Sequence, residues 1–342
     1  MQRTTQPFEF HGKTGEFFKI WIVNIMLSII TLGIYSAWAK VRTRRYFYGN
    51  TFLMNTPFDY LADPVKILKG RLLAFALILL YSFSALISPI LEGVLVLIFI
   101  PLFPWIIIKS LQFNLYNSTY RNIRFHFAGD YLKALWVFIG LPVAVAFSLG
   151  LAYPYFAKER KKFVIDHSAY GTSQFSTAVT AGQFYGIYMK TAGVTLAVVL
   201  LGAGFNYALQ LVLPMSNASE AAFILPALMA LLFFPFLMIV YGYIYTTLTN
   251  LVINHTSLQQ CRFRSNLETM KMCWLYFSNT VAIIFSLGLL IPWAMIRTAR
   301  YRISCMTLMT VPDPEAFIAA EAEKADAIGE ELGDLLDIDF GL

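Results

Sequence analysis

Charged residues are scarce in this sequence. Its 342 residues include 26 Lys and Arg and 20 Asp and Glu, together 13% of the chain, whereas 58% are hydrophobic. A soluble domain averages about 25% charged residues, so this composition excludes an ordinary soluble protein. Several apolar runs approach the ~20 residues that cross a ~30 Å hydrocarbon core, and they lack the alternation of membrane-spanning strands. We therefore predict an all-α polytopic membrane protein, because a helix satisfies its own backbone in lipid.

Cysteine and histidine are scarce as well. Cys261, Cys273 and Cys305 have no ligand-like spacing, which excludes a disulfide framework and a cysteine metal site. The four histidines lie in polar connections, where we favour a role in turns over metal binding. Serine-hydrolase, zinc-peptidase and P-loop motifs are missing, and "GAGF" at 202–205 lacks the context of a dinucleotide fingerprint. We expect no enzyme activity, no metal and no cofactor.

The positive charge is unevenly distributed. Ten carboxylates and one base, Lys324, follow Val311, so this tail carries −9 and the preceding residues carry +15 of the net +6. A basic protein can bind nucleic acid, but these bases flank apolar runs, where they set orientation and contact anionic lipid. We therefore predict membrane lipids as partners and no nucleic acid. Protein partners are not indicated.

One segment occurs in three similar copies along the chain. "TLGIYSAWAKVRTRRY" at 31–46 aligns without gaps with "SLGLAYPYFAKERKKF" at 148–163 and "SLGLLIPWAMIRTARY" at 286–301. The offsets are 117 and 255 residues, and the register extends upstream to Phe8, Phe125 and Phe263. An internal repeat in an apolar chain is typical of transporter-like folds, although not confined to them. The copies indicate repeat units of about 8–124, 125–262 and 263–312.

A second pattern separates the apolar runs. Asn or His, then Ser or Thr, then a Phe seven residues further on occurs four times, beginning at Asn50, Asn117, His167 and His255. Loose alternation with Asn, Ser, Thr and Gly predicts short β-hairpins outside the membrane. Isolated hairpins are marginal, so they either pack into one small platform or are polar linkers of shared ancestry.

We predict about seven apolar membrane segments in a 3+3+1 pattern within a membrane domain spanning 1–312. One kind of segment precedes each basic cluster, and the other kind forms two pairs. They are 17–38, 72–90, 92–110, 132–155, 191–213, 222–244 and 274–296. The tail 313–342 is rich in Ala and Glu, which predicts a partly helical or disordered segment.

The charge rule conflicts with seven crossings. Bases favour cytoplasmic loops, and the connections on both sides of 132–155 are basic, which a single crossing cannot satisfy. In one solution, three segments do not cross but break at a glycine and return to the side they came from; they are 17–38, 132–155 and 274–296, with Gly33, Gly150 and Gly288. In the other, all seven segments cross, and the two three-span units have opposite orientations. We favour seven crossings, because the segments are long enough.

Several residues are candidates for function. Asn24 and Asn279 occupy equivalent apolar positions, where an interhelical hydrogen bond is a simpler role than a substrate path. Trp38, Trp293, Tyr46 and Tyr301 suit a membrane interface. Three basic clusters suit either lipid anchoring or a specific phosphate or lipid-headgroup site. They are Lys40, Arg42, Arg44 and Arg45, then Lys158, Arg160, Lys161 and Lys162, then Arg297, Arg300 and Arg302.

These motifs resemble those of the YjgN family of bacterial inner-membrane proteins, a domain of unknown function. The residues that carry the resemblance are "FEFHG" at 8–12, "NIMLSIITLGIYSAWAKVRTRRYFYGNT" at 24–51, and "FDY" with "ILKGR" ending at Arg71. Ser36 departs from the Pro that the family tends to have, and the middle copy lacks the Trp. The resemblance implies a multi-pass plasma-membrane protein and supplies no activity.

Two hypotheses for function follow. The repeats and the intramembrane asparagines favour a transporter or lipid-handling permease. The alternative is a non-enzymatic scaffold that binds cytoplasmic partners through its hairpins and acidic tail.

Overall fold

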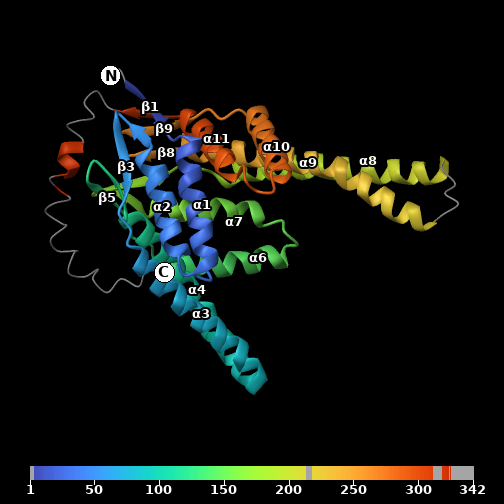
Figure 1. The fold of residues 1–342 in the computed structure, drawn as a ribbon, viewed down its shortest axis with the longest axis horizontal. Helices are drawn as coiled ribbons and strands as arrows, with labels where there is room; N and C mark the ends of the chain where they lie inside the picture. Colours follow the sequence, from blue (N-terminus) through green and yellow to red (C-terminus); the bar gives the residue numbers. More distant parts are fainter. Residues whose placement is uncertain (1–3, 213–217, 311–317, 323, 325–342) are drawn as a thin grey trace.

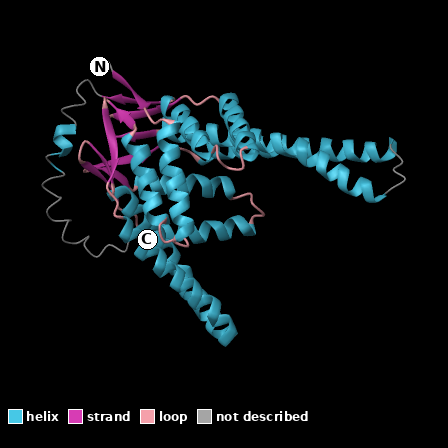
Figure 2. Cartoon of the chain, viewed as in Figure 1, coloured by secondary structure: helices cyan, strands magenta, loops and turns pink. Residues whose placement is uncertain are grey.

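The computed structural model describes residues 4–212, 218–310, 318–322 and 324. Within these ranges, ten short strands form one closed antiparallel barrel (Figure 2). In chain order they are β1 (Thr4–Phe10), β2 (Thr51–Leu53), β3 (Thr56–Tyr60), β4 (Ser118–Tyr120), β5 (Ile123–Phe127), β6 (Ser168–Tyr170), β7 (Ser173–Thr177), β8 (Thr256–Leu258), β9 (Cys261–Ser265) and β10 (Met306–Thr310).

Each strand contributes one large apolar side chain to a ring inside the barrel. Residues that pair directly across neighbouring strands point to the same face of the sheet. Phe8 pairs with Leu53, and Phe58 pairs with Tyr120, so a Phe alternates with a Leu or Tyr around the ring. The other members are Phe125, Tyr170, Phe175, Leu258, Phe263 and Leu308. The Phe of the second sequence pattern therefore forms the lumen of a barrel, and none of the described strands is left with an unpaired edge.

Helices connect the strands at one end of the barrel, and two-residue turns connect them at the other. The helical segments are α1 (Thr14–Ile30), α2 (Ser36–Gly49), α3 (Pro64–Ile87), α4 (Pro89–Tyr116), α5 (Tyr131–Leu135), η1 (Trp136–Gly140), α6 (Leu141–Phe147), α7 (Tyr153–Asp166), α8 (Ala181–Val212), α9 (Ala218–Asn254), α10 (Thr269–Phe285) and α11 (Ile291–Ser304). Five helical hairpins thus leave and return to one end, the helix end; the opposite end is the turn end. Figure 1 shows the hairpins α3/α4 and α8/α9 projecting furthest from the barrel.

The Asn/His–Ser/Thr pairs join helix to strand. The Asn50 amide donates to the Tyr46 carbonyl at 2.7 Å, and His167 Nδ1 donates to the Phe163 carbonyl at 2.8 Å. The hydroxyl of the next residue donates to the next carbonyl of the helix, as Thr51 does to the Phe47 carbonyl. Both side chains thereby satisfy carbonyls that a helix C-terminus leaves open. For His167 and His255, the pattern is a helix cap before a strand.

The three Leu–Gly copies form the same tight turn. Leu32, Leu149 and Leu287 have φ of 49°, 50° and 51°, and the glycines that follow have φ of 92°, 88° and 90°. Such backbone favours glycine. In the first copy the Gly33 N–H donates to the Ser28 carbonyl at 2.7 Å. The helix therefore ends and reverses at this point in each copy.

The prediction of an all-α fold with about seven membrane segments is wrong, because the described residues contain a closed barrel and four helices long and apolar enough to cross a membrane. Segments 17–38, 132–155 and 274–296 each break at the Leu–Gly turn into antiparallel helices, because the left-handed backbone cannot continue a right-handed helix. The predicted hairpins, left open as one platform or polar linkers, join with β1 and β10 in one closed barrel. The tail 313–342 lies outside the described residues except for 318–322 and 324.

Four helices in the described ranges are long and apolar enough to cross a membrane. They contain the spans Pro64–Ile87, Pro89–Tyr116, Ala181–Phe205 and Pro235–Asn254. Only 6% to 17% of each apolar window is buried inside the protein. Helices that expose so much apolar surface need lipid or another apolar cover.

Candidate functional site: the basic rim and the barrel lumen

The first basic cluster lies on α2, where two arginines join the helix to the barrel. Arg44 donates to the Tyr60 hydroxyl at 2.8 Å and to the Asn114 side-chain oxygen. Arg45 donates to the carbonyls of Tyr60 at 3.1 Å and Ala62 at 3.3 Å. Both guanidinium groups are hydrogen-bonded within the protein. We call the basic residues of α2, α7 and α11, together with Arg71 of α3, the basic rim.

The third cluster lies on α11 and repeats part of this arrangement. Arg300 donates to the Gly12 carbonyl at 2.9 Å, which joins α11 to the segment after β1. Arg297 donates to the Ser278 hydroxyl at 2.6 Å and lies 5.0 Å from the ring centre of Trp293. Arg302 stacks over Tyr245 of α9 at 5.0 Å. All three side chains therefore have partners that are uncharged.

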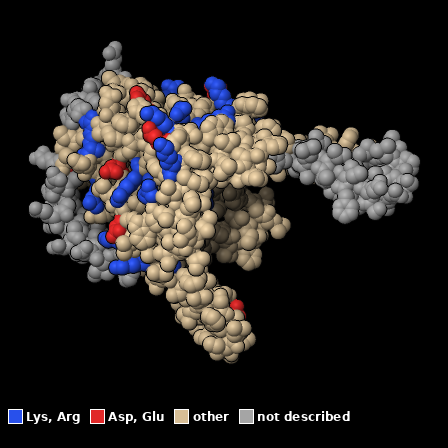
Figure 3. Space-filling model, viewed as in Figure 1, with Lys and Arg blue, Asp and Glu red and all other residues tan. Residues whose placement is uncertain are grey.

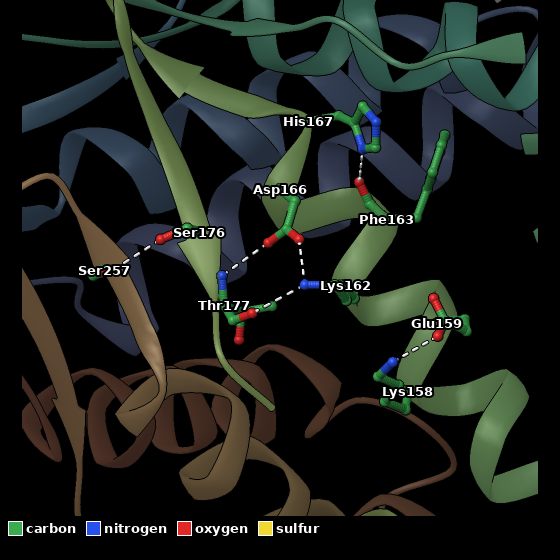
Figure 4. A network of polar contacts seen from close by, with 9 residues as sticks. All are labelled: Lys158, Glu159, Lys162, Phe163, Asp166, His167, Ser176, Thr177 and Ser257. Atoms are coloured by element: carbon green, nitrogen blue, oxygen red, sulfur yellow. Dashed lines mark hydrogen bonds and ion pairs between the residues drawn. The ribbon is translucent and has the colours of Figure 1, made fainter. Parts of the chain in front are cut away.

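The second cluster, on α7, is partly neutralised. Figure 4 shows Lys158 paired with Glu159 at 2.6 Å, and Lys162 paired with Asp166 at 2.8 Å. Lys162 also donates to the Thr177 carbonyl, and Asp166 accepts from the Thr177 N–H at 2.8 Å. This network ties α7 to β7. Arg160 and Lys161 remain exposed at the surface.

The two asparagines bridge the helices of their hairpins. Asn279 donates to the Ala294 carbonyl at 3.4 Å and accepts from Arg297 at 3.0 Å. Asn24 makes the equivalent contacts with Ala39 at 3.4 Å and Arg42 at 3.5 Å. Both asparagines are buried, and these contacts account for their polar groups without a substrate. In the middle copy the aligned positions hold Leu141 and Glu159 instead.

The aromatic candidates contact helix ends or neighbouring side chains. The Tyr46 hydroxyl accepts from the Lys13 N–H at 2.8 Å, and the Tyr301 hydroxyl accepts from the Glu268 N–H at 3.0 Å. Each tyrosine thereby satisfies a backbone donor at the start of α1 or α10. Trp38 stacks on Tyr35 with ring centres 6.0 Å apart. Their placement at a membrane interface stays a prediction.

Two groups of like charge remain on the rim. Lys40 lies near Arg44 and Arg71, and Lys161 lies near Arg160 and Arg302. Both lysine side chains reach the surface, but partial loss of solvent around each ammonium group, and then the charges of these neighbours, lower its pKa. Within the described ranges none of these six side chains is paired with a carboxylate. Figure 3 shows Lys and Arg gathered over the barrel and the adjoining helices, while the projecting hairpin α3/α4 is almost free of them. Such clusters attract anions.

A groove between α1 and α2 leads from one of these groups toward the Leu–Gly turn. Its volume is about 560 Å³, and its lining includes Lys40 and Arg44 together with Trp21, Ile25 and Ile29. The basic residues lie toward the barrel, whereas Ile29 lies next to the turn. One groove therefore offers positive charge at one end and an apolar wall at the other.

The barrel lumen is the second candidate site, and sequence reasoning missed what closes it. Inside the ring is an apolar cavity of about 290 Å³. Residues 318–322, the C-terminal segment, cover it with Ile318, while Glu321, 1% exposed, reaches the turn between β6 and β7. The carboxylate accepts from the N–H groups of Thr172 at 2.8 Å and Ser173 at 3.1 Å, and from both hydroxyls. Nothing local in the tail sequence signals this contact.

Comparison with known proteins places these features in a family. Residues 5–335 match the family model described as "Bacterial protein of unknown function (DUF898)". The chain is 30% identical over 338 residues to the inner membrane protein YjgN of Salmonella typhimurium strain LT2, covering 84% of each chain. It is 28% identical over 159 residues to the YjgN proteins of Escherichia coli O157:H7 and K12, covering 45% of this chain and 39% of each relative. No solved structure matches.

The relatives and the apolar helices agree on location. The matched proteins are named inner membrane proteins, and four helices in the described ranges have the length and composition of membrane spans. The protein is a bacterial inner-membrane protein.

Proposed function

Because the chain belongs to the DUF898 family, whose function is unknown, we propose a function from its own geometry. The protein is a multi-pass lipid-handling protein that binds the headgroups of anionic phospholipids at its basic rim. The observation that carries this proposal is the groove between α1 and α2, which joins basic side chains that have no carboxylate partner within the described ranges to an apolar wall.

The exposed turns support a position for the rim at the headgroup layer. Leu32, Leu149 and Leu287 are 93% to 95% exposed, which is unfavourable in water for three leucines in equivalent positions. Lys40 lies four residues into α2, which begins at Ser36 after the turn, or about 6 Å along the helix at ~1.5 Å per residue. A turn that dips into the outer part of a leaflet's ~15 Å hydrocarbon half therefore places Lys40 near the lipid headgroups.

The turns also satisfy their own backbone, as lipid requires. The Thr31 hydroxyl donates to the Leu27 carbonyl at 2.7 Å and accepts from the Tyr35 N–H at 2.9 Å. The hydroxyls of Ser148 and Ser286 accept in the same way from Ala152 and Leu290, both at 3.0 Å. These contacts support a topology in which the short hairpins α1/α2, α6/α7 and α10/α11 enter one leaflet and return. The hairpins α3/α4 and α8/α9 cross the whole membrane.

The charge distribution supports a cytoplasmic barrel. Every helical hairpin returns to the helix end of the barrel, so the rim and the barrel share one side of the membrane. Lys and Arg favour the cytoplasmic side, and each base near an anionic leaflet contributes about 1 kcal/mol.

Binding has more support than transport or scaffolding. The two projecting hairpins leave the barrel in different directions (Figure 1), and a path across the membrane needs helices that enclose it. A scaffold that captures partners by strand pairing needs a free sheet edge, whereas the described strands are all paired. Both roles stand as alternatives with less support than lipid binding.

The test is lipid selectivity of the purified full-length protein. Delipidated protein is titrated with dioleoyl phosphatidylglycerol or dioleoyl phosphatidylcholine, and bound lipid is counted by native mass spectrometry. Lys40→Gln with Arg71→Gln is expected to weaken phosphatidylglycerol binding about 10- to 30-fold, at ~1 kcal/mol for each base, and to leave phosphatidylcholine unchanged. Lys271→Gln is the matched control, because Lys271 is exposed and paired with Glu268. Equal affinity of wild type and double variant for phosphatidylglycerol would sink the proposal.

A further inference from the structure

We infer that the barrel lumen and the turn at Gly171–Ser173 form a binding site for a long-chain fatty acid, which the C-terminal segment occupies when the ligand is absent. The lumen would take the acyl chain, and the turn would take the carboxylate. This site is separate from the groove between α1 and α2, and it uses none of the rim bases.

The carboxylate site is built into one turn of the barrel. Four hydrogen bonds from Thr172 and Ser173 reach the Glu321 carboxylate, two from backbone N–H groups and two from hydroxyls. Lys324 lies 3.9 Å away on the exposed side. A buried carboxylate is stable only with such partners, and these donors reach both oxygens of the carboxylate.

The glycine of this turn sets it apart from the other three. Gly171 has φ of 56°, and a Cβ added there would lie 2.8 Å from the Glu321 carboxylate and 3.2 Å from Ile123. The corresponding positions in the other turns hold Met54, Arg121 and Gln259, also with positive φ. The positive φ alone therefore does not require glycine at position 171, because other residue types adopt it in the other turns. The close approach of the Glu321 carboxylate is what requires a residue without a Cβ there.

The lumen suits an aliphatic chain or side chain and does not suit a polypeptide backbone. The hydroxyl of Tyr120 donates to the Leu53 carbonyl, and that of Tyr170 to the Tyr120 carbonyl, so both are engaged in the wall. The Thr310 hydroxyl contacts Thr4 at 2.7 Å. A peptide would bring amides into this cavity without partners, whereas an acyl chain needs none. At about 290 Å³ the cavity has roughly twice the volume of the ~150 Å³ apolar cavities known to bind benzene.

The C-terminal segment has the two chemical features of such a ligand. Ile318 enters the lumen, and Glu321 lies three residues further on, on the same helical face. An aliphatic group in the cavity and a carboxylate on the turn are the two ends of a fatty acid. The segment therefore acts as an internal competitor, and the apparent affinity for the ligand falls by the fraction of molecules whose site is free.

The test uses full-length protein in a neutral detergent and a palmitate analogue with a diazirine near its methyl end. After photolysis, peptides are mapped for labelling. In Ile318→Ala with Glu321→Gln, labelling of the peptides that contain Phe125 and Phe175 is expected to rise at least 10-fold over wild type. Ala319→Gln with Ala320→Gln is the matched control, because these residues are exposed on the same turn; it should label as wild type does. Hydrogen exchange of β4 to β7 checks that the barrel stays folded.

A third variant separates a ligand site from a simple plug. Adding Gly171→Ala to the double variant fills the space at the carboxylate, so the gain in palmitate labelling should disappear while the barrel stays protected. Unlabelled palmitate should compete at least 10-fold better than hexadecanol, which lacks the carboxylate. A folded double variant without lumen labelling would overturn the proposal, as would labelling that Gly171→Ala does not reduce or that hexadecanol competes equally.

Discussion

The two ends of the barrel are closed by different means. At the helix end, Tyr60 and Phe17 are completely buried, and Arg45 and Arg300 hydrogen-bond the backbone next to the strands. At the turn end, in the part of the chain that the structure describes, the closing element is the C-terminal segment, held by Glu321 and Ile318. One end is therefore a packed joint between the barrel and several helices, whereas the other is covered by one short segment that is held by a few side chains.

The largest effect is expected at the helix end. Tyr60→Ala removes a fully buried ring from a cluster with Val41, Ile67 and Phe113. Large-to-small changes of this kind cost about 3–5 kcal/mol, so the free energy of unfolding in mixed micelles should fall by that amount. Tyr60→Phe removes only the hydroxyl that Arg44 contacts and should cost about 1 kcal/mol. Equal losses for both variants would show that the joint depends on the hydrogen bond and not on packing.

A smaller loss is expected from the bridging asparagines. Asn279→Leu removes the 3.0 Å contact with Arg297 and a 2.9 Å contact with Thr298, which should cost about 1–2 kcal/mol of unfolding free energy. Asn24→Leu should cost less, because its contacts are 3.4 and 3.5 Å long. Denaturant titration of both variants measures the difference. A greater loss at Asn24 would contradict the assignment of Asn279 as the tighter bridge.

Breaking the turn end should change local opening but not global stability. Glu321→Gln weakens charge-assisted hydrogen bonds worth about 1.5–3 kcal/mol, so exchange of the Thr172 and Ser173 amides should accelerate at least 10-fold. Amides of α1 and α2 should be unaffected, because the helix end does not contact Glu321. The measurement is hydrogen exchange by mass spectrometry. Equal acceleration at both ends would mean that the ends are one cooperative unit.

Lowering the pH should reproduce part of the faster amide exchange expected for Glu321→Gln. Burial alone would raise the pKa of the Glu321 carboxyl, but hydrogen bonds from Ser173 and Thr172 and the charge of Lys324 outweigh it and lower the pKa below its ordinary 4.5. The contact therefore contributes fully above about pH 4.5 and weakens as the pH falls through the lowered value. Exchange at Thr172 should rise below that pH in wild type and show no such rise in Glu321→Gln.

Local patterns were visible in the sequence because their hydrogen bonds are local, although the Asn and His residues were assigned to hairpin turns and are helix caps. The Leu–Gly turn joins residues five apart, from Ser28 to Gly33, and the caps at Asn50 and His167 join residues four apart. The choice between crossing and returning was not readable. Segment 17–38 is long enough to span, and only the left-handed backbone at Leu32 and Gly33 reverses it.

The rim was partly predictable. Its bases were visible as clusters, yet the sequence could not distinguish Lys158, neutralised by Glu159, from Lys161, which faces two arginines. Arg71 joins Lys40 from a different helix. Which charges stay unpaired depends on how helices pack, and spacing along the chain does not determine that.

The sequence by itself determined a membrane protein with a Leu–Gly segment that recurs three times and a recurring Phe. Composition and contacts within one helical turn are enough for these features. The tertiary structure alone decided that the Phe side chains from different strands meet in one lumen, that the strands close, and that Glu321 reaches Ser173 across 148 residues. Those features bring together residues that are far apart in the sequence, which costs loop-closure entropy. Only the contacts of the assembled barrel compensate that cost.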